Sequence, residues 1–364
     1  MRISIKKEAL LCGIQAVIGA VTLKNTLPIL SNILLETNNN KIKITATDLD
    51  IGITATIDAI IQEQGAITVF AKRFADIVKE LPDSEIEITA KKNNTIIIKT
   101  ETTIFKILTT PKDEFPQLPK PTAIKEIILN QADLKKMLLK TTFAISKDET
   151  RYVLNGICFI VNKRGIKLVA TDGRRLAIVK HKQEIETQEE KKYIIPTKTA
   201  QELIKNLNDT QQIKIQFSKN QVAFYLNNLH IVSRLIEGEF PDYKQAIPKE
   251  VGKKLKIERN KLLPAIKRAG LLTTPESQAI KLHLTKNKIT ISKTTPEIGE
   301  TKEEIEAQYT GEELLVGFNP VYLQEALKNI NQDIIEIELT GPEKPGVIRI
   351  GDSYIYIVLP MQIS

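Results

Sequence analysis

The acidic residues Asp48, Asp50 and Asp172 are the side chains of this sequence whose type and spacing come nearest to chemistry. Carboxylates grouped after apolar segments bind Mg²⁺, which nucleases use to activate water. The alternative is that each Asp ends a strand and organises a turn through its side chain. We favour the turn, because Asp48 and Asp172 each end a copy of the same triplet, Ala-Thr-Asp. A repeated structural turn explains two copies, whereas an active site does not need to be built twice.

Other catalytic or metal-binding patterns are missing from the sequence. The three histidines, His181, His230 and His283, have no zinc-like spacing with Cys12 and Cys158. There is no glycine-rich phosphate loop, no Gly-x-Ser-x-Gly and no clear nucleophile–base pair. We therefore predict a protein without catalytic residues, metal or cofactor, and we expect both cysteines to be buried free thiols.

The triplet belongs to a long internal repeat. Ala46-Thr47-Asp48 recurs 124 residues later as Ala170-Thr171-Asp172, and Phe115-Pro116 is echoed by Phe240-Pro241. Leu30-Ser31-Asn32-Ile33 is likewise echoed at residues 154–157. A chain with such a period consists of copies of one domain, which is the plan of a scaffold.

A third copy emerges from the hydrophobic periodicity. Segments 71–88, 197–215 and 320–337 each combine a helical apolar stripe, a polar turn and an alternating strand. Further helices are predicted at 6–21, 131–145 and 260–272, and most other segments alternate as strands do. The pattern predicts an α+β fold with two helices packed on antiparallel sheet in each of three similar domains, at residues 1–122, 123–250 and 251–364.

Composition limits the class of protein. The chain has 364 residues, 42% of them hydrophobic, a net charge of +8 and a pI near 9.1. No apolar run reaches the ~20 residues of a membrane span, and the N-terminal segment reads as a strand without the apolar core of a signal peptide. We expect a cytoplasmic protein without a membrane partner. The dense charge run at 184–192 is predicted to be a solvated loop.

Lysine and arginine recur on the predicted helices. Lys136 and Lys140 lie four apart, and Lys198, Lys205 and Arg73 mark equivalent helices in two repeats. On any single helix, such lysines and arginines are most simply explained as an ordinary solvent-exposed face. If equivalent helices face a common centre, their charges sum into a surface that holds duplex DNA by its phosphates, without reading sequence.

Several motifs resemble those of the bacterial DNA polymerase III beta subunit family, the sliding clamps. They are residues 171–177 (Thr-Asp-Gly-Arg-Arg-Leu-Ala), residues 27–30 (Leu-Pro-Ile-Leu), residues 240–243 (Phe-Pro-Asp-Tyr) and the end Leu359-Pro360-Met361. The resemblance runs over the whole chain. It implies a non-catalytic processivity factor, a head-to-tail homodimer that forms a six-domain ring, encircles duplex DNA and slides along it.

The resemblance also implies three sets of residues. The DNA-facing set is Lys24, Arg73, Lys79, Lys136, Lys140, Lys198 and Lys205. The dimer interface is Phe105 and Ile107 against Leu271 and Leu272, with Glu300, Glu303 and Glu304 facing basic residues such as Arg73 and Lys106. A hydrophobic groove for short peptides of polymerases, the clamp loader and other DNA-handling proteins comprises Leu154, Thr171, Gly173, Arg174, Arg175, Leu176, Pro241, Ala246, Ile357, Val358, Leu359, Pro360 and Met361.

The sequence departs from the family pattern at Arg174, often histidine, at Leu359, usually methionine, and at Gln245 and Ala246. The tail ends Gln362-Ile363-Ser364, where Arg-Leu is commoner. These departures bear on which peptides the groove prefers. Two alternatives remain: a Mg²⁺-dependent nuclease using Asp48 and Asp172, and a repeat scaffold that binds only proteins.

Overall fold

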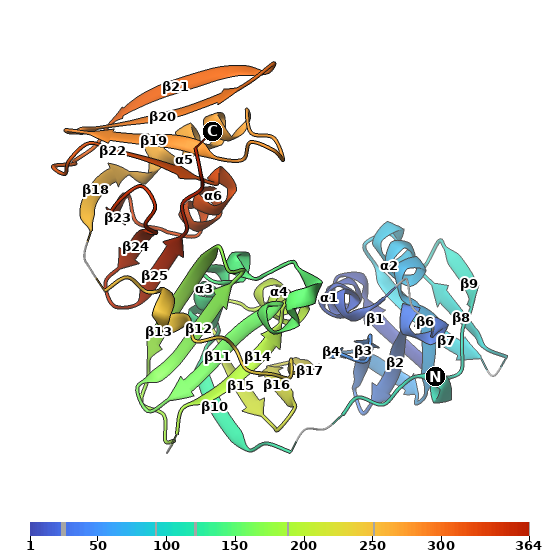
Figure 1. Ribbon diagram of the computed structural model, residues 1–364. Coiled ribbons are helices and arrows are strands. Elements are labelled where there is room, and N and C mark those ends of the chain that lie inside the picture. Colours follow the sequence, from blue (N-terminus) through green and yellow to red (C-terminus); the bar gives the residue numbers. More distant parts are fainter. Residues whose placement is uncertain (23–26, 92, 120–121, 188, 250–251, 364) are drawn as a thin grey trace. The chain divides into compact units, whose positions relative to one another are not determined.

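The computed structural model describes residues 1–22, 27–91, 93–119, 122–187, 189–249 and 252–363. The chain forms two compact units, which we call unit 1 (Met1–Ala132 with Gln201–Leu235) and unit 2 (Asp133–Ala200 with Ile236–Ser364). Each unit contains antiparallel sheets and helices (Figure 1). The three-domain boundaries after residues 122 and 250 stay a prediction.

Unit 1 contains a five-stranded and an eight-stranded sheet. In spatial order the first consists of β5 (Ile60–Glu63), β1 (Arg2–Lys6), β7 (Glu85–Lys91), β8 (Thr95–Lys99) and β9 (Ile104–Leu108). The second consists of β10 (Lys125–Asn130), β15 (Gln212–Phe217), β16 (Gln221–Leu226), β17 (Leu229–Arg234), β4 (Ile51–Asp58), β3 (Lys41–Thr47), β2 (Asn32–Asn38) and β6 (Ala66–Phe70). Strands from different sequence repeats therefore meet where β17 pairs with β4.

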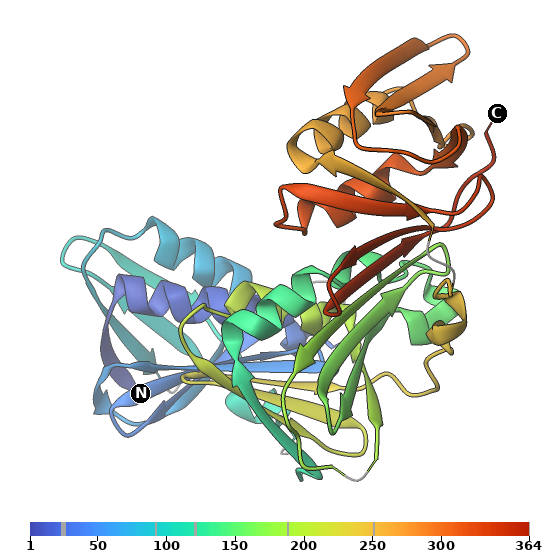
Figure 2. The same ribbon diagram turned by 90° about the vertical axis from the view of Figure 1, so that its left-hand side faces the viewer.

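Helices cover one side of these sheets. In Figure 2 the two blue helices, α1 (Lys7–Val17) and α2 (Ala71–Glu80), lie side by side over the strands of unit 1. Their apolar stripes explain this: Leu10 and Ile14 of α1 and Phe74 of α2 are completely buried. A third helix, α4 (Thr197–Asn206), spans the two units in sequence.

Unit 2 repeats the same plan. Its eight-stranded sheet consists of β14 (Lys191–Pro196), β11 (Gly156–Asn162), β12 (Gly165–Thr171), β13 (Arg175–Lys182), β25 (Tyr354–Val358), β24 (Gly346–Ile350), β23 (Ile334–Leu339) and β18 (Lys253–Glu258). Its four-stranded sheet consists of β21 (Gly299–Glu306), β20 (Lys288–Thr295), β19 (Ile280–Thr285) and β22 (Leu314–Phe318). The helices are α3 (Gln131–Leu139), α5 (Arg259–Gly270) and α6 (Pro320–Lys328). The join of β13 with β25 is the counterpart of the join of β4 with β17.

Two predicted helices are shorter than expected. The helix predicted at 131–145 ends as α3 at Leu139, because the hydroxyls of Thr141 and Thr142 donate to the carbonyl oxygens of Met137 and Leu138. The helix predicted at 6–21 ends at Val17 and continues as a 3₁₀ turn, Ile18–Ala20.

Two further sequence expectations have mixed outcomes. Cys158 is buried as predicted, but Cys12 is exposed, because it lies on the outer side of α1. The charge run at 184–192 falls mainly in the connection between β13 and β14, where its glutamates are exposed. Among the described residues, no helix is long and apolar enough to cross a membrane.

Candidate functional site

The turn between β12 and β13 is built by Asp172. Its Oδ1 accepts hydrogen bonds from the backbone N–H groups of Arg174 and Arg175, at 2.9 and 3.0 Å. The Thr171 hydroxyl donates to the Arg175 carbonyl oxygen and accepts from the Gly173 N–H. Gly173 has φ of +87°, a conformation that glycine adopts without strain. The Asp side chain thus organises a turn.

The first repeat builds the same turn. Asp48 Oδ1 accepts from the N–H groups of Asp50 and Ile51, at 3.0 and 2.9 Å, and Thr47 donates to the Ile51 carbonyl oxygen. Leu49 occupies the position of Gly173, with φ of +80°. The predicted turn role of Asp48 and Asp172 is confirmed. Among the described residues, no group of three or more His, Cys, Asp or Glu is placed to hold a metal ion.

Arg175 lies at the start of β13 and is buried, with 6% of its surface exposed. Its Nε donates to Asp172 Oδ2 at 3.1 Å, and its two terminal nitrogens donate to Glu325 of α6 and to the Phe143 carbonyl oxygen. The guanidinium also stacks on the Tyr322 ring, with Cζ 4.4 Å from the centroid. Burial is the largest single effect and disfavours the charged form, but the hydrogen bond with Glu325 and the nearby charges of Glu325 and Asp172 together outweigh it, so the pKa of Arg175 is raised.

The role of Arg175 differs from the sequence expectation. We predicted that Arg175 lines a groove. In the structure its guanidinium instead makes all its described hydrogen bonds with groups of its own chain. These contacts fix the start of β13 to α6 and to the 3₁₀ turn Thr142–Ala144. Arg175 is therefore a positioning residue for the turn that carries Gly173 and Arg174.

The pairing of β13 with β25 brings most of the predicted groove residues together. Leu176 is opposite Ile357 and Arg175 is opposite Val358. Leu176, Ile357 and Leu154 belong to one buried apolar cluster. Leu154 arrives from the 3₁₀ segment Glu149–Leu154, so the cluster collects side chains from three separate parts of the sequence.

The residues predicted for the groove did not include Phe240 and Tyr243, which belong to this cluster. Phe240 and Tyr243 are buried against it, on the segment that carries the exposed Pro241 and Ala246. A signal existed, because Phe240 belongs to the repeated Phe-Pro pair. Asp242 caps the 3₁₀ turn Tyr243–Ala246 by accepting from the Lys244 N–H at 3.2 Å.

The C-terminal tail is tied to the same place by backbone hydrogen bonds. The Leu359 N–H donates to the Arg174 carbonyl oxygen at 2.9 Å, and the Met361 N–H donates to the Gly317 carbonyl oxygen at 2.9 Å. A Cβ on Gly317 would lie 2.6 Å from the Met361 carbonyl oxygen, so glycine is required for this close approach. Leu359 remains 42% exposed, and Pro360 and Met361 are half-buried. The apolar tail is thus docked but partly open to solvent.

Five of the seven residues predicted for the dimer interface lie on two edge strands, and the other two, Leu271 and Leu272, follow helix α5. Phe105 and Ile107 are on β9, the edge of the five-stranded sheet in unit 1, beside Leu108, which is 84% exposed. Glu300, Glu303 and Glu304 are on β21, the edge of the four-stranded sheet in unit 2. Exposed apolar residues on an edge strand are typical of a protein contact.

Two of the acidic residues predicted for the interface have ion-pair partners in their own chain. Glu303 accepts a bidentate pair of hydrogen bonds from Arg268 of α5, at 2.5 and 2.9 Å, because helix and edge strand lie side by side. Glu304 pairs with Lys288 at 3.1 Å and with Lys302. Leu271, just after α5, is 81% exposed, and Leu272 is half-buried.

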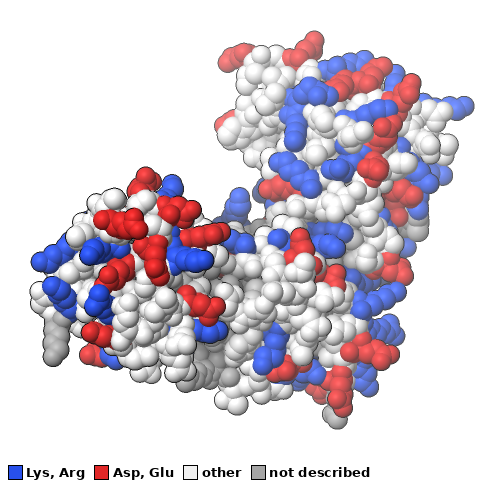
Figure 3. All heavy atoms as spheres, turned by 180° about the vertical axis from the view of Figure 1, so that it is seen from behind, with Lys and Arg blue, Asp and Glu red and all other residues white. Residues whose placement is uncertain are grey.

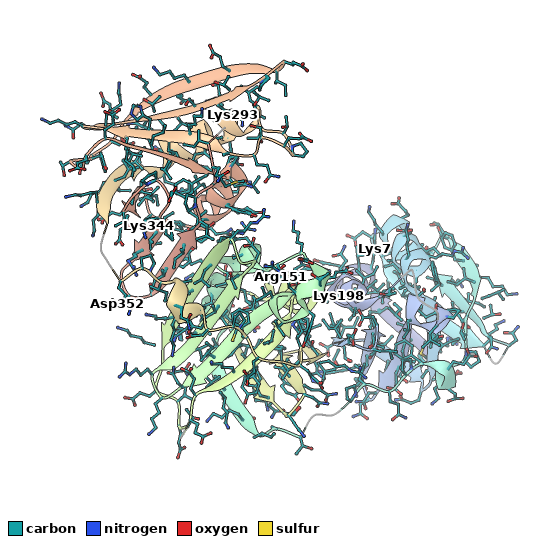
Figure 4. All side chains as sticks on the ribbon, viewed as in Figure 1. Lys7, Arg151, Lys198, Lys293, Lys344 and Asp352 are labelled. Carbon is teal, nitrogen blue, oxygen red and sulfur yellow. The ribbon has the colours of Figure 1, made fainter. Side chains whose placement is uncertain are left out.

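The predicted DNA-facing residues are distributed over both units. Arg73 and Lys79 are exposed on α2 in unit 1, and Lys136 is exposed on α3 in unit 2. Lys198 is half-buried near the start of α4 and is labelled in Figure 4. Lys24 lies outside the described residues. Figure 3 shows Lys and Arg interspersed with Asp and Glu on the face it presents, so the net charge of +8 is not a uniformly basic surface there.

Two of these lysines are less available than predicted. Lys205 donates to the Gln15 carbonyl oxygen at 2.7 Å, because the end of α4 lies beside α1 in unit 1. Lys140 follows the end of α3, with its Nζ 5.5 Å from the centre of the Tyr354 ring. Burial, followed by the charge of Lys136, lowers the pKa of Lys140.

Comparisons with known proteins agree over the whole chain. Models of the DNA polymerase III beta subunit match residues 1–119 (N-terminal domain), 128–242 (central domain) and 244–362 (C-terminal domain). The beta sliding clamp of Chlamydia pneumoniae is 31% identical over 347 residues, covering 95% of each chain, and that of Staphylococcus aureus is 32% identical, covering 100% of this chain and 99% of its own.

Solved structures give the same result. The DNA polymerase sliding clamp of Bacillus subtilis superposes with a TM-score of 0.94 at 31% identity, and a Pseudomonas aeruginosa sliding clamp bound to griselimycin superposes with 0.93 at 30%. Both cover 100% of each chain.

Proposed function

Because the chain belongs to the DNA polymerase III beta subunit family, the bacterial sliding clamps, we propose that two copies close head to tail into a six-domain ring around duplex DNA. Like the family, this chain is a non-catalytic processivity factor of DNA replication. The observation that carries the proposal is the match of the entire chain, at a TM-score of 0.94, to a sliding clamp.

The ring proposal is supported by two unpaired sheet edges. β9 exposes Phe105 and Leu108, and β21 carries Glu300 with its backbone edge free of a partner strand among the described residues. Pairing of β9 in one copy with β21 in the next would hide both edges, and a heterologous contact of this kind closes into a ring when its rotation allows.

DNA would be held by the helices and by topology. Arg73, Lys79 and Lys136 are exposed on helices, as non-specific phosphate contacts require. Since each contact can be exchanged for an equivalent one, weak attraction permits sliding while the closed ring prevents escape. Lys205 and Lys140 contribute less, because both already have partners in the chain.

The partner site is the surface around the apolar cluster of Leu154, Leu176 and Ile357, with the tail Leu359–Met361 at its rim. We propose that it takes a short peptide ending in apolar residues, from a replicative polymerase, the clamp loader or other DNA-handling proteins. We further propose three domains with boundaries after residues 122 and 250, and a cytoplasmic location.

Fluorescence anisotropy with a labelled Gln-Leu-Ser-Leu-Phe peptide tests the partner site. Saturable binding is expected for the full chain and not for a chain truncated after Val358, which loses the docked tail. A chain truncated after Met361 is the matched control, because it keeps the Leu359 and Met361 backbone hydrogen bonds. Equal binding by all three chains would refute the role of the tail. Lack of binding by the full chain would refute the site.

A further inference from the structure

A basic cavity of about 600 Å³ opens on unit 2, and the sites described above do not use it. It lies where β11, β12 and β13 meet their connecting loops. Five cations line it, and we call them the cavity cations: Lys163, Arg164, Lys167, Lys180 and Lys182. The opposing charges are Glu189, Glu190 and Asp352, the last in the turn between β24 and β25 (Figure 4).

The positive charge of this cavity is only partly balanced within the described part of the chain. There, none of the cavity cations lies within 4.0 Å of a carboxylate oxygen in an ion pair. Of the three acids, Glu189 pairs with Lys191 at 3.2 Å, whereas Glu190 accepts from the neutral amide Nδ2 of Asn162 at 3.2 Å and keeps its charge. With five cations against three acids, the lining keeps a positive net charge, which attracts anionic groups.

Lys167 is the most constrained of the cavity cations. It is half-buried, and its Nζ donates to the Tyr243 hydroxyl at 3.3 Å. Burial and the neighbouring charges of Lys180 and Lys244 lower the pKa of Lys167, against the opposing effect of Glu190. An arriving carboxylate would relieve this crowding of like charges.

The cavity continues the face of the sheet that carries the predicted groove. Lys167 and Lys180 are directly paired in register, and each lies two residues from a member of the apolar cluster, Val169 on β12 and Ile178 on β13. Residues two apart on a strand share a face. Tyr243 belongs to the cluster and touches Lys167. This face of the sheet is therefore apolar and buried at Val169 and Ile178, which are 0% and 2% exposed, and becomes basic and exposed at Lys180.

The distance between the groove end and the cavity end of this face sets the length of a ligand that reaches from one to the other. Leu176, in the apolar cluster, and Lys180 are four residues apart, about 13 Å at ~3.3 Å per residue of strand. An extended peptide covers this distance with about four residues.

The side of the sheet that carries the cavity is the side turned away from helix α6. Ala177 and its register partner Tyr356 point to the other side, where the Tyr356 hydroxyl donates to the Tyr322 carbonyl oxygen of α6 at 2.9 Å. Since the proposed DNA contacts are on helices, the position of the cavity favours an acidic peptide over nucleic acid.

We propose that the basic cavity binds acidic side chains of the same partner peptide whose apolar end occupies the groove, with its Asp or Glu residues about four positions from the apolar anchor. This rests on the proposed function. The cavity would then select among partners by charge, in addition to the apolar selection made by the groove.

Anisotropy with four labelled peptides tests the inference. They are Gln-Leu-Ser-Leu-Phe alone, the same peptide with three acidic residues placed four positions before or four positions after it, and a neutral Asn/Gln version of the tighter extended peptide. We expect one acidic peptide to bind about five- to tenfold more tightly than its neutral version, as two or three exposed charge pairs would give. The gain is expected to vanish at about 1 M salt, where the screening length is ~3 Å.

Reversing the charge of one cavity cation tests whether the cavity is where the acidic residues bind. Lys180→Glu is expected to remove the gain while changing the affinity for the unextended peptide less than about twofold, as for surface charges away from a contact. Lys219→Glu, an exposed residue outside the cavity with the same change in charge, is expected to keep the gain.

The outcomes separate the two proposals. Binding of the unextended peptide without a gain from acidic residues would overturn the inference and leave the proposed function intact. Absence of binding by any peptide would overturn both. A loss of duplex DNA retention in Lys180→Glu, with no loss for the acidic peptide, would assign the cavity to nucleic acid and overturn the inference.

Discussion

Replacing Arg175 with methionine removes a buried cation and keeps most of its apolar stem. The guanidinium contacts Asp172, Glu325 and the Phe143 carbonyl oxygen and stacks on Tyr322. In Arg175→Met these acceptors lose their donor, and the turn between β12 and β13 loses its connection to α6.

The exposure of each partner sets the magnitude. Removing one member of a buried ion pair costs about 3–5 kcal/mol, because the remaining charge is stranded. The Asp172 side chain is 15% exposed and that of Glu325 is 32% exposed, so water can solvate the latter once the arginine is gone. We therefore expect a cost at the lower end of this range, which is a decrease of about 3 kcal/mol in the unfolding free energy of unit 2.

Hydrogen exchange followed by mass spectrometry reports on unit 2 within the whole chain. For amides of β13 and β25 that exchange only when the sheet opens, 3 kcal/mol corresponds to roughly a hundredfold faster exchange. Arg174→Met is the matched control. Its side chain is exposed and has no ion pair in the described part of the chain, so a change within about 0.5 kcal/mol is expected.

The result that would refute this reasoning is unchanged exchange in Arg175→Met together with lost peptide binding. Arg175 would then contact the partner directly, as first predicted from the sequence, and the positioning role would be wrong. Faster exchange with the expected magnitude supports the positioning role even if peptide affinity falls as well.

Four further predictions concern stability and reactivity. Gly317→Ala places a Cβ against the Met361 carbonyl oxygen and is expected to destabilise tail docking by about 1–3 kcal/mol, measured as faster carboxypeptidase release of the C-terminal residues; an unchanged rate would contradict the close approach. Lys293 (Figure 4) is buried and donates to three oxygens, so Lys293→Met is expected to cost about 2 kcal/mol in thermal unfolding, and an equally stable variant would show that these bonds add nothing. Burial raises the pKa of the Cys158 thiol to about 12, so iodoacetamide at pH 8 should modify Cys12 alone in the folded protein, and modification of both at equal rates would contradict the burial. Because the folded chain holds the Cys158 proton to higher pH than the unfolded chain, this group lowers the unfolding free energy as pH rises from about 9 to about 12, and Cys158→Ala should flatten that part of the pH dependence in denaturation.

The periodic elements could be predicted from the sequence because their causes are local. The strands predicted at the ends of segments 71–88, 197–215 and 320–337 are found as β7, β15 and β23, since alternation alone defines a half-buried strand. The Asp48 and Asp172 turns were recognised because each uses only the next few backbone N–H groups. The end of α3 was missed because two threonine hydroxyls compete for its last carbonyl groups, which a hydrophobic stripe does not reveal.

The role of Arg175 could not be predicted in this way. Its partner Glu325 lies 150 residues away, and only the pairing of β13 with β25 brings α6 to it. The same holds for Glu303, whose pairing with Arg268 depends on how α5 packs beside β21. The family resemblance predicted a set of groove residues, several of which the pairing of β13 with β25 brings together, but it did not reveal that Arg175 is bound within the chain.

Retention on circular DNA tests the ring most directly. The chain would be loaded on a nicked circular duplex with its clamp loader and ATP, separated from free protein by gel filtration, and challenged with a single restriction cut. A ring held by topology is expected to stay on the circle and to leave once the DNA is linear. Equal retention on circular and linear DNA, or none after loading, would contradict the account, the first in favour of ordinary DNA binding and the second in favour of a protein-binding scaffold.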